Sequence, residues 1–265
     1  MKYIIPLTIL TAFFVSCEKE LDFHYHDVAP QLVIEATVSD RGTNILLTNT
    51  TPMGEAMNLT PLTDAEVIVT DMTDGHSRTI VAGPDGAYTD DMAGIEGHEY
   101  RINVNREGRS YESSCTMRPA AEILALEFQW IKMPYDYVAV LQVSFTDPDT
   151  SGDYYWVRLL RNGEPYMWSV TDDSRAVGGV IHEVIRTSRK EIDKEDDKTV
   201  LRDGDRITAI VAPVSRDMAD YLTALEKDSN GPRMFSGDFC LGYFLAASLS
   251  ESEIIYRPDE MKEYK

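Results

Sequence analysis

The stretch PLTDAEVIVTDMTDGHSRTIVAGPDGAYTDD, residues 61–91, decides the fold class of this 265-residue chain. Ala65, Val67 and Val69 recur at every second position and would point to the same face, which is the pattern of a strand that buries one face. The residues TDGH then supply a turn, RTIVA runs back, and PDG turns the chain again before Tyr88. Short strands separated by such turns indicate an antiparallel β-sheet.

The segments on either side repeat the same pattern. QLVIEATVSD (31–40) alternates, NILLTNTTP (44–52) follows it, and GIEGHEYRINVNREGRSYESSCTM (94–117) has the form of a hairpin about REG. This spacing of strands and turns is typical of an all-β sandwich. The order DAEVIVTD, DGAY and GHEYRINV also resembles the transthyretin-like sandwich. We therefore expect residues 29–118 to form an immunoglobulin- or transthyretin-like β-sandwich.

A second β-rich domain is expected over residues 119–265. The sequence RPAAE (118–122) has the character of a linker, because Pro119 would interrupt a strand ladder. Strong strand patterns follow in ILALEFQWI (123–131) and YVAVLQVSFTD (137–147). The sequence thus predicts a mainly β protein of two domains.

The second domain is also expected to contain one long exposed hairpin or loop and one amphipathic helix. Residues 171–198 become polar and charged, which favours the loop. The helix is expected at about residues 216–228, with Ser215 as its N-cap and Asp217 in its first turn. Its apolar residues recur at helical spacing: Met218, Tyr221, Leu222 and Leu225.

The N-terminus has the layout of a bacterial lipoprotein signal. Lys2 precedes the apolar run YIIPLTILTAFFV (3–15), which is too short to cross a hydrocarbon core, and charged residues start directly after Cys17. We expect residues 1–16 to be removed, and Cys17 to carry the lipid (diacylglycerol and, on the new amino terminus, an acyl chain such as palmitate). Residues 17–28 would then be a tether that holds the protein at a membrane. A cleaved secretory signal with an incidental cysteine is the alternative.

Two further observations bear on location and partners. The acidic sequence CEKELD after the lipidated position resembles the export signal of surface lipoproteins of Bacteroidetes. The formal net charge of the chain is -20 at pH 7, which disfavours binding to nucleic acid and is otherwise explained by solubility. We therefore expect an outer-membrane protein, lipid-anchored and exposed at the cell surface, with no nucleic-acid partner.

The segment RITAIVAPVSRDMADYLTALEKDSNGPRMFSGDFCLGYFLAAS (206–248) resembles the C-terminal part of a family of Bacteroidetes lipoproteins known as domain of unknown function 4249. The segments EKELDF, PQLVIEATV and LTDAEVIVTD fit the same family, so the resemblance spans nearly the whole mature chain. The stretch between MFSG and FCLGYF is shorter than is usual there. Genes of this family commonly lie beside TonB-dependent outer-membrane receptors. The resemblance therefore implies an accessory to nutrient uptake, and it brings no catalytic residues with it.

Candidate metal ligands are few. His24 and His26 would share one face of a strand, but their segment DFHYHD (22–27) has the position of a tether and offers no third histidine. The sequence DPDTSGD (147–153) matches the first half of an EF-hand loop, yet Arg158 occupies the position of the bidentate glutamate. We expect a tether and a β-turn respectively, with no metal and no cofactor.

Catalytic motifs are absent from the sequence, whereas aromatic residues are concentrated in the second domain. The chain contains no nucleophile elbow, no HExxH sequence and no glycine-rich phosphate loop. The aromatic residues either fill a core or form a surface for a ligand or partner. Those proposed for the surface are Trp130, Tyr135, Tyr154, Trp156, Tyr166 and Trp168.

Two cysteines remain after lipidation. Cys115 and Cys240 lie in strand-like segments that are expected in different domains, so we expect free buried thiols, with a disulfide as the alternative. For function, we expect a non-enzymatic lipoprotein that assists a TonB-dependent receptor in ligand capture. An adhesion or structural lipoprotein of the envelope is the alternative, and a hydrolase with an unrecognised site is the third hypothesis.

Overall fold

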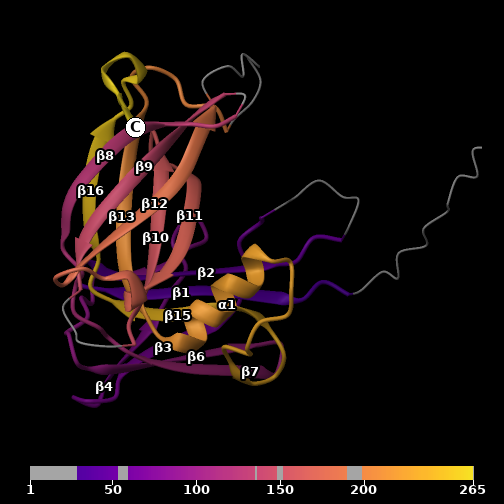
Figure 1. Ribbon diagram of the computed structural model, residues 1–265. Helices are drawn as coiled ribbons and strands as arrows, with labels where there is room; N and C mark the ends of the chain where they lie inside the picture. The colour runs from indigo at the N-terminus through magenta and orange to yellow at the C-terminus, as the bar shows by residue number, and fades with distance from the viewer. Residues whose placement is uncertain (1–28, 53–58, 135, 148–151, 190–198, 265) are drawn as a thin grey trace, which may run out of the picture.

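The computed structural model describes residues 29–52, 59–134, 136–147, 152–189 and 199–264. These residues form two β-sandwiches with one helix, α1 (Arg216–Glu226), at their junction (Figure 1). The strands of the second sandwich stand upright in this view, and those of the first lie across their lower end. The prediction of a mainly β fold with one helix is confirmed. Within the described ranges, no helix is long and apolar enough to span a membrane.

The first sandwich is built from β1 (Leu32–Ser39), β2 (Gly42–Asn49), β3 (Glu66–Asp71), β4 (His76–Ile80), β5 (Tyr88–Asp90), β6 (Glu99–Arg106), β7 (Arg109–Thr116), β14 (Ser236–Gly237) and β15 (Leu241–Ala247). One sheet has the order β15-β1-β2-β5 and the other has the order β14-β7-β6-β3-β4. Alternate residues of facing strands fill the core between them, such as Ile34 and Ala36 of β1 and Val67 and Val69 of β3.

The second sandwich is built from β8 (Ile123–Lys132), β9 (Tyr137–Thr146), β10 (Tyr154–Arg161), β11 (Glu164–Asp172), β12 (Val180–Arg189), β13 (Arg206–Val214), β16 (Ser250–Ile255) and β17 (Lys262–Tyr264), with short 3-10 turns at Asp173–Arg175 and Pro258–Glu260. Its sheets have the orders β11-β10-β13-β16 and β12-β9-β8-β17. Phe145 and Tyr155 meet edge to face in its core, at 5.1 Å between ring centroids. Strands β11 and β12 are edge strands of the two sheets, and they lie next to each other.

The expected boundary after residue 118 does not separate two cores. Strand β15 pairs in parallel with β1, and Phe235, Cys240 and Phe244 pack in the core of the first sandwich. The chain thus returns to its N-terminal sandwich after it has built most of the second one. The division into residues 29–118 and 119–265 needs this correction, and its cause is a pairing across about two hundred residues that no local pattern reveals.

Helix α1 follows the sequence pattern closely. The Ser215 hydroxyl accepts a hydrogen bond from the Met218 N–H at 3.2 Å, as an N-cap does. The helix ends at Glu226, two residues short of the expectation, because Asp228 adopts a left-handed conformation with φ of 48°. Met218 and Leu222 pack against Trp156 and Val214 of the second sandwich and Leu245 of the first. This third core ties the two sandwiches together.

The described part of residues 171–198 is not one exposed loop. Strand β12 occupies 180–189 and pairs antiparallel with β9. It buries Ile181 and Ile185 and leaves much of its other face exposed, so its sequence is too polar to be recognised as a strand. This strand supplies one wall of the groove described below.

The two cysteines of the described residues lie in the same sandwich. Cys240 is buried, Cys115 is half-buried, and both are free thiols that pack in or against the first core. The expectation of free thiols therefore agrees with the structure, whereas their assignment to different domains was wrong because β15 returns to β1.

Candidate functional site

The aromatic residues proposed for a surface fall into two groups. Trp130 is 4% exposed and donates its Nε1–H to the Pro258 carbonyl at 3.1 Å. The Tyr166 hydroxyl donates to the carbonyls of Thr187 and Thr199, at 3.2 and 2.7 Å. Both side chains belong to the core of the second sandwich, so the core interpretation holds for them. Tyr135 lies outside the described residues.

The other three, Tyr154, Trp156 and Trp168, lie on the opposite face of the β10–β11 sheet, toward α1 and β15. Trp156 is 7% exposed and meets Tyr243 of β15 edge to face, at 5.5 Å between ring centroids. Trp168 is 36% exposed and meets Trp156 edge to face at 6.5 Å. The structure thus assembles an aromatic junction, consisting of Trp156, Trp168 and Tyr243, with Trp168 at its solvent side.

Arg158 lies within this junction, and the sequence analysis did not propose it for a ligand surface. Its guanidinium carbon is 4.5 Å from the centroid of the Trp156 ring, and Trp168 is its cross-strand neighbour. Alternation along YYWVRLLR places it on the same face as Trp156, which was the available signal. Burial lowers the pKa of Arg158, and the neighbouring Tyr243 acts in the opposite direction.

Two tyrosines and a glutamate complete the surroundings of the junction. Tyr221 of α1 lies 6.5 Å from Tyr243, ring to ring, and Glu35 of β1 is the register partner of Tyr243. Burial raises the pKa of Tyr243, and the charge of Glu35 adds to this effect. Partial desolvation also raises the pKa of Glu35, although this side chain remains exposed. The junction therefore combines aromatic faces with a half-buried cation and an exposed acidic group.

A groove runs beside the junction, along the free edges of β11 and β12. It consists of two hollows of about 260 and 550 Å³ that share Glu183 of β12. Residues of α1 line both, with Asp220 and Thr223 in the smaller one and Glu226 in the larger one. Trp168 lines the larger hollow, so the groove and the aromatic junction meet at this side chain.

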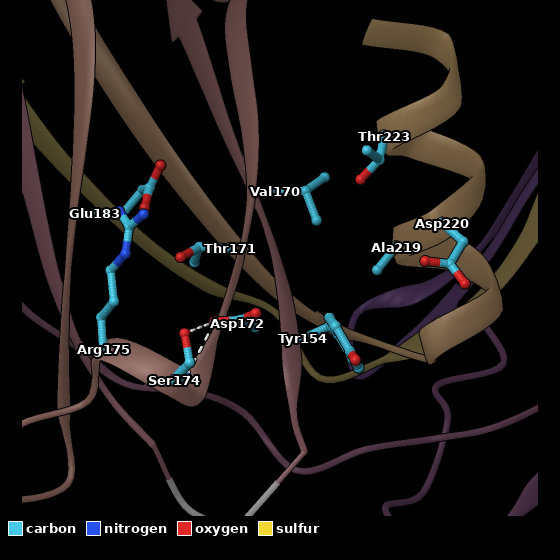
Figure 2. A pocket seen from close by; sticks show the side chains of 10 residues that line it. All are labelled: Tyr154, Val170, Thr171, Asp172, Ser174, Arg175, Glu183, Ala219, Asp220 and Thr223. Atoms are coloured by element: carbon cyan, nitrogen blue, oxygen red, sulfur yellow. Dashed lines mark hydrogen bonds between the residues drawn. The ribbon is translucent and has the colours of Figure 1, made fainter. Parts of the chain in front are cut away.

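Glu183 is the central charged group of the groove. Figure 2 shows Glu183 and Arg175 extending toward one another on one side of β11, with Asp220 and Thr223 of α1 on the other side. Burial raises the pKa of Glu183; the hydroxyls of Ser169 and Thr171 and the charge of Arg175 oppose that rise, and Glu226 adds to it. The groove is therefore polar and can hold an extended or sugar-like ligand through hydrogen bonds.

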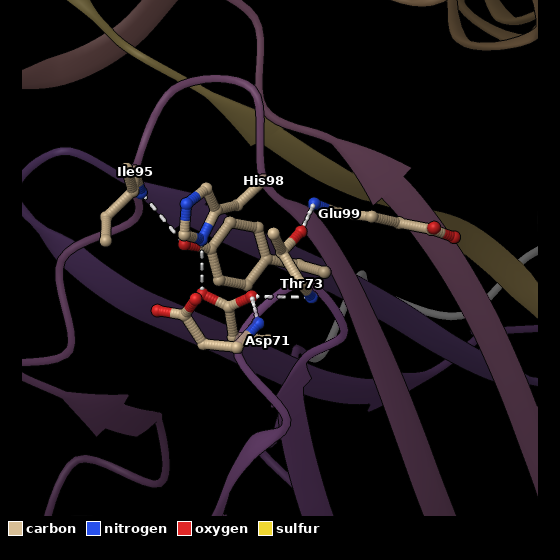
Figure 3. A network of polar contacts seen from close by, with 7 residues as sticks. Asp71, Thr73, Ile95, His98 and Glu99 are labelled. Atoms are coloured by element: carbon tan, nitrogen blue, oxygen red, sulfur yellow. Dashed lines mark hydrogen bonds and ion pairs between the residues drawn. The ribbon is translucent and has the colours of Figure 1, made fainter.

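A third polar cluster lies at the far end of the first sandwich, at the β3–β4 turn. Ligand atoms of Asp71, Asp74 and His98 lie within 4.8 Å of one another, a spacing that suits a cation. However, Asp71 is 6% exposed, its Oδ1 accepts the N–H groups of Thr73 and Asp74, and its Oδ2 lies 2.8 Å from His98 Nδ1 (Figure 3). One oxygen thus fixes the turn, and the other links it to His98, the residue that precedes β6.

Hydrogen bonding also fixes the charge of that cluster. Burial by itself raises the pKa of Asp71, but the hydrogen bonds from His98, from the two turn N–H groups and from Tyr100 outweigh it, so the pKa lies below its ordinary value. The Tyr100 hydroxyl in turn accepts the Ile95 N–H at 2.8 Å. These contacts assign the cluster a structural role.

The remaining candidates can be placed only in part. Cys17, His24 and His26 lie outside the described residues, as do residues 148–151 of the DPDTSGD loop. Asp147 accepts a hydrogen bond from the Tyr155 hydroxyl at 2.6 Å, and Asp153 pairs with Arg118. The first carboxylate of that loop therefore anchors a core tyrosine, whereas the predicted β-turn itself falls on residues outside the described ones.

Comparison with known protein families assigns the chain to a family. No curated protein sequence matches the chain. A family model described as "Domain of unknown function (DUF4249)" matches residues 18–255, which is most of the chain. The expected family is thereby confirmed: this chain belongs to the DUF4249 family.

Proposed function

We propose that this protein is a non-enzymatic lipoprotein of the outer membrane, exposed at the cell surface, that captures a ligand for a TonB-dependent receptor. Cys17 carries the lipid, and residues 17–28 tether two β-sandwiches above the membrane, as in lipoproteins of Bacteroidetes. The first sandwich is of the transthyretin-like kind. Membership of the DUF4249 family supports this proposal, because genes of that family commonly lie beside TonB-dependent receptors.

The observation that carries ligand capture is the groove between β11, β12 and α1. It combines polar groups, such as Glu183 and Asp220, with the exposed ring of Trp168. Sugars and peptides are held by this mixture of hydrogen-bonding groups and aromatic faces. Because α1 also packs on β15 of the first sandwich, the groove has a rigid base that both sandwiches share.

An affinity pull-down of the full-length lipidated protein from gently solubilised native outer membranes tests the proposal. We expect a TonB-dependent receptor in a stoichiometric amount, and we expect the Cys17→Ala protein, which carries no lipid, to recover much less of it. Recovery of the lipoprotein alone, from membranes in which such receptors are abundant and intact, would contradict the proposal and favour an adhesion or structural role in the envelope.

A further inference from the structure

Arg158 is a half-buried cation without a counterion. Among the described residues, no carboxylate lies within ion-pairing distance of its guanidinium, and its buried Nε–H has no hydrogen-bond partner. A buried charge without a partner costs free energy, so proteins seldom retain one without a use for it. Its stacking on Trp156 offsets only part of this cost.

The other sheltered arginines of this chain show how unusual that is. On the same strand, Arg161 Nη2 lies 2.7 Å from Asp205 Oδ2. In the first sandwich, the Arg106 guanidinium forms two hydrogen bonds to the carboxylate of Asp64. With 45 acidic residues in the chain, a carboxylate partner for Arg158 would have been easy to provide. The exception therefore points to a partner from outside the chain.

A second unpaired donor belongs to the same cluster. Trp156 is 7% exposed, and its buried Nε1–H also lacks a hydrogen-bond partner. Unsatisfied buried donors are rare in folded proteins, and two on side chains in direct contact are rarer still. Arg158 is half-buried and its neighbour Trp168 is 36% exposed, so a ligand can approach the cluster from solvent.

We propose that Arg158, Trp156 and Trp168 form a binding site for a carboxylate carried on a six-membered ring, as in an aromatic acid or a sugar acid. The planar guanidinium matches the two oxygens of a carboxylate, and the exposed face of Trp168 receives the ring. The net charge of -20 opposes multiply charged phosphates, which favours an acid with a single negative charge. This inference deepens the proposed function by naming the chemistry of the captured ligand, and it rests on that function only for its biological role.

The test uses the purified full-length protein in detergent, titrated by calorimetry and by tryptophan fluorescence. Benzoate and glucuronate are the two probes, and benzyl alcohol and glucose are their neutral counterparts; inorganic phosphate is a third anion. We expect one of the two acids to bind at least about tenfold more tightly than its neutral counterpart, as a charge-assisted contact requires. Which acid binds distinguishes an aromatic acid from a sugar acid.

Variants assign the binding to the cluster. Arg158→Met removes the charge at nearly constant volume, and we expect at least about a tenfold loss of affinity. Arg158→Lys, which keeps the charge without the fork, and Trp168→Ala at the rim should each weaken binding as well. Arg109→Met is the control, because Arg109 is an exposed arginine of β7 in the first sandwich that lines neither hollow of the groove; it should bind the probe like the wild type.

Two outcomes would overturn the inference: no binding of either acid by the wild type, or equal binding by wild type and Arg158→Met of unchanged melting temperature. Tighter binding of phosphate than of both acids would also contradict it. The receptor pull-down measures a different contact and needs no probe. If the protein recovers a receptor but binds neither acid, the proposed function stands and the carboxylate site is refuted. If the protein binds an acid but recovers no receptor, the carboxylate site stands and the proposed function is refuted.

Discussion

Gly242 of β15 lies against the backbone of Ile34 of β1, so closely that a Cβ on Gly242 would stand 1.9 Å from the Ile34 carbonyl oxygen. Its φ of 105° is also a conformation that side chains disfavour. This contact is part of the parallel pairing that brings the C-terminal region back to the first sandwich.

We therefore expect Gly242→Ala to lower the free energy of unfolding by about 3–5 kcal/mol, because the two backbones must separate. Gly163→Ala is the control: Gly163 also has a positive φ, of 90°, but no atom lies within 4 Å of its added Cβ. It should cost only about 1 kcal/mol of backbone strain. Urea denaturation of both variants measures the difference, and equal losses would show that the close approach is unimportant.

The Asp71 cluster should make stability depend on pH in the acid range. The pKa of Asp71 lies below its ordinary value of 3.8, so the folded state binds the proton less readily than the unfolded state. The stabilisation is therefore complete above about pH 5 and is lost as the pH falls through the folded-state pKa.

Asp71→Asn should then cost about 1–3 kcal/mol near pH 7, and this cost should shrink below pH 4. Unfolding curves of wild type and variant between pH 3 and pH 7, a range set by these values, give the comparison. Asp74→Asn, at the exposed neighbour in the same turn, serves as the control. If the cost of Asp71→Asn did not change with pH, ionisation of Asp71 would not be the source of the stabilisation.

Two arginines of β10 should respond in opposite ways to removal of their charge. Arg158→Met removes an unpaired charge, so the free energy of unfolding should stay unchanged or rise by up to about 1 kcal/mol. Arg161→Met leaves the buried Asp205 carboxylate without its cation and should cost about 2–4 kcal/mol. Thermal and urea unfolding of both variants compare them directly, and a large loss in Arg158→Met would indicate a structural role for Arg158.

The thiols of Cys115 and Cys240 should be unreactive in the folded protein. Burial raises the pKa of Cys240 to about 12 and also raises the pKa of Cys115, so little thiolate is present at pH 8. In the Cys17→Ala protein, we expect a thiol reagent to modify almost no cysteine until denaturant is added, and then to modify both. Failure to detect two thiols after unfolding would reveal a disulfide.

Lipidation of Cys17 can be followed in cells that express the protein. Metabolic labelling with an alkyne-bearing palmitate should mark the wild type, and Cys17→Ala should lose the label and leave the membrane fraction. Cys115→Ala, at a thiol of the folded core, should keep both properties. Label retained in Cys17→Ala would move the modification to another residue.

Local patterns predicted the elements whose information is local. The alternation of Ile34 and Ala36 and the cap formed by Ser215 correspond to β1 and to the start of α1. Strand β12 was missed because it is an edge strand whose buried apolar residues are only Ile181 and Ile185; the other two residues that it buries, Thr187 and Ser188, are polar. Because β12 was missed, the sequence also could not predict that residues of this strand, such as Glu183, line the groove.

Features that depend on contacts between residues far apart in the sequence could not be predicted from local patterns. The sequence LGYFLAAS was recognised as a strand, but its partner was not, because a parallel pairing with β1 leaves no local trace. Likewise, alternation places Arg158 beside Trp156, whereas its lack of a counterion depends on where every acidic side chain lies in the folded chain. That property exists only in three dimensions.

The parallel pairing of β15 with β1 also constrains how the chain matures. The ribosome releases β1 long before residue 241 exists, so the N-terminal sandwich cannot close while the chain is still being synthesised. Until then, the unpaired side of β1 offers its backbone to any other extended strand. Chaperones would have to cover this edge. A product truncated before residue 241 would keep the edge of β1 unpaired, and we expect proteases to degrade it.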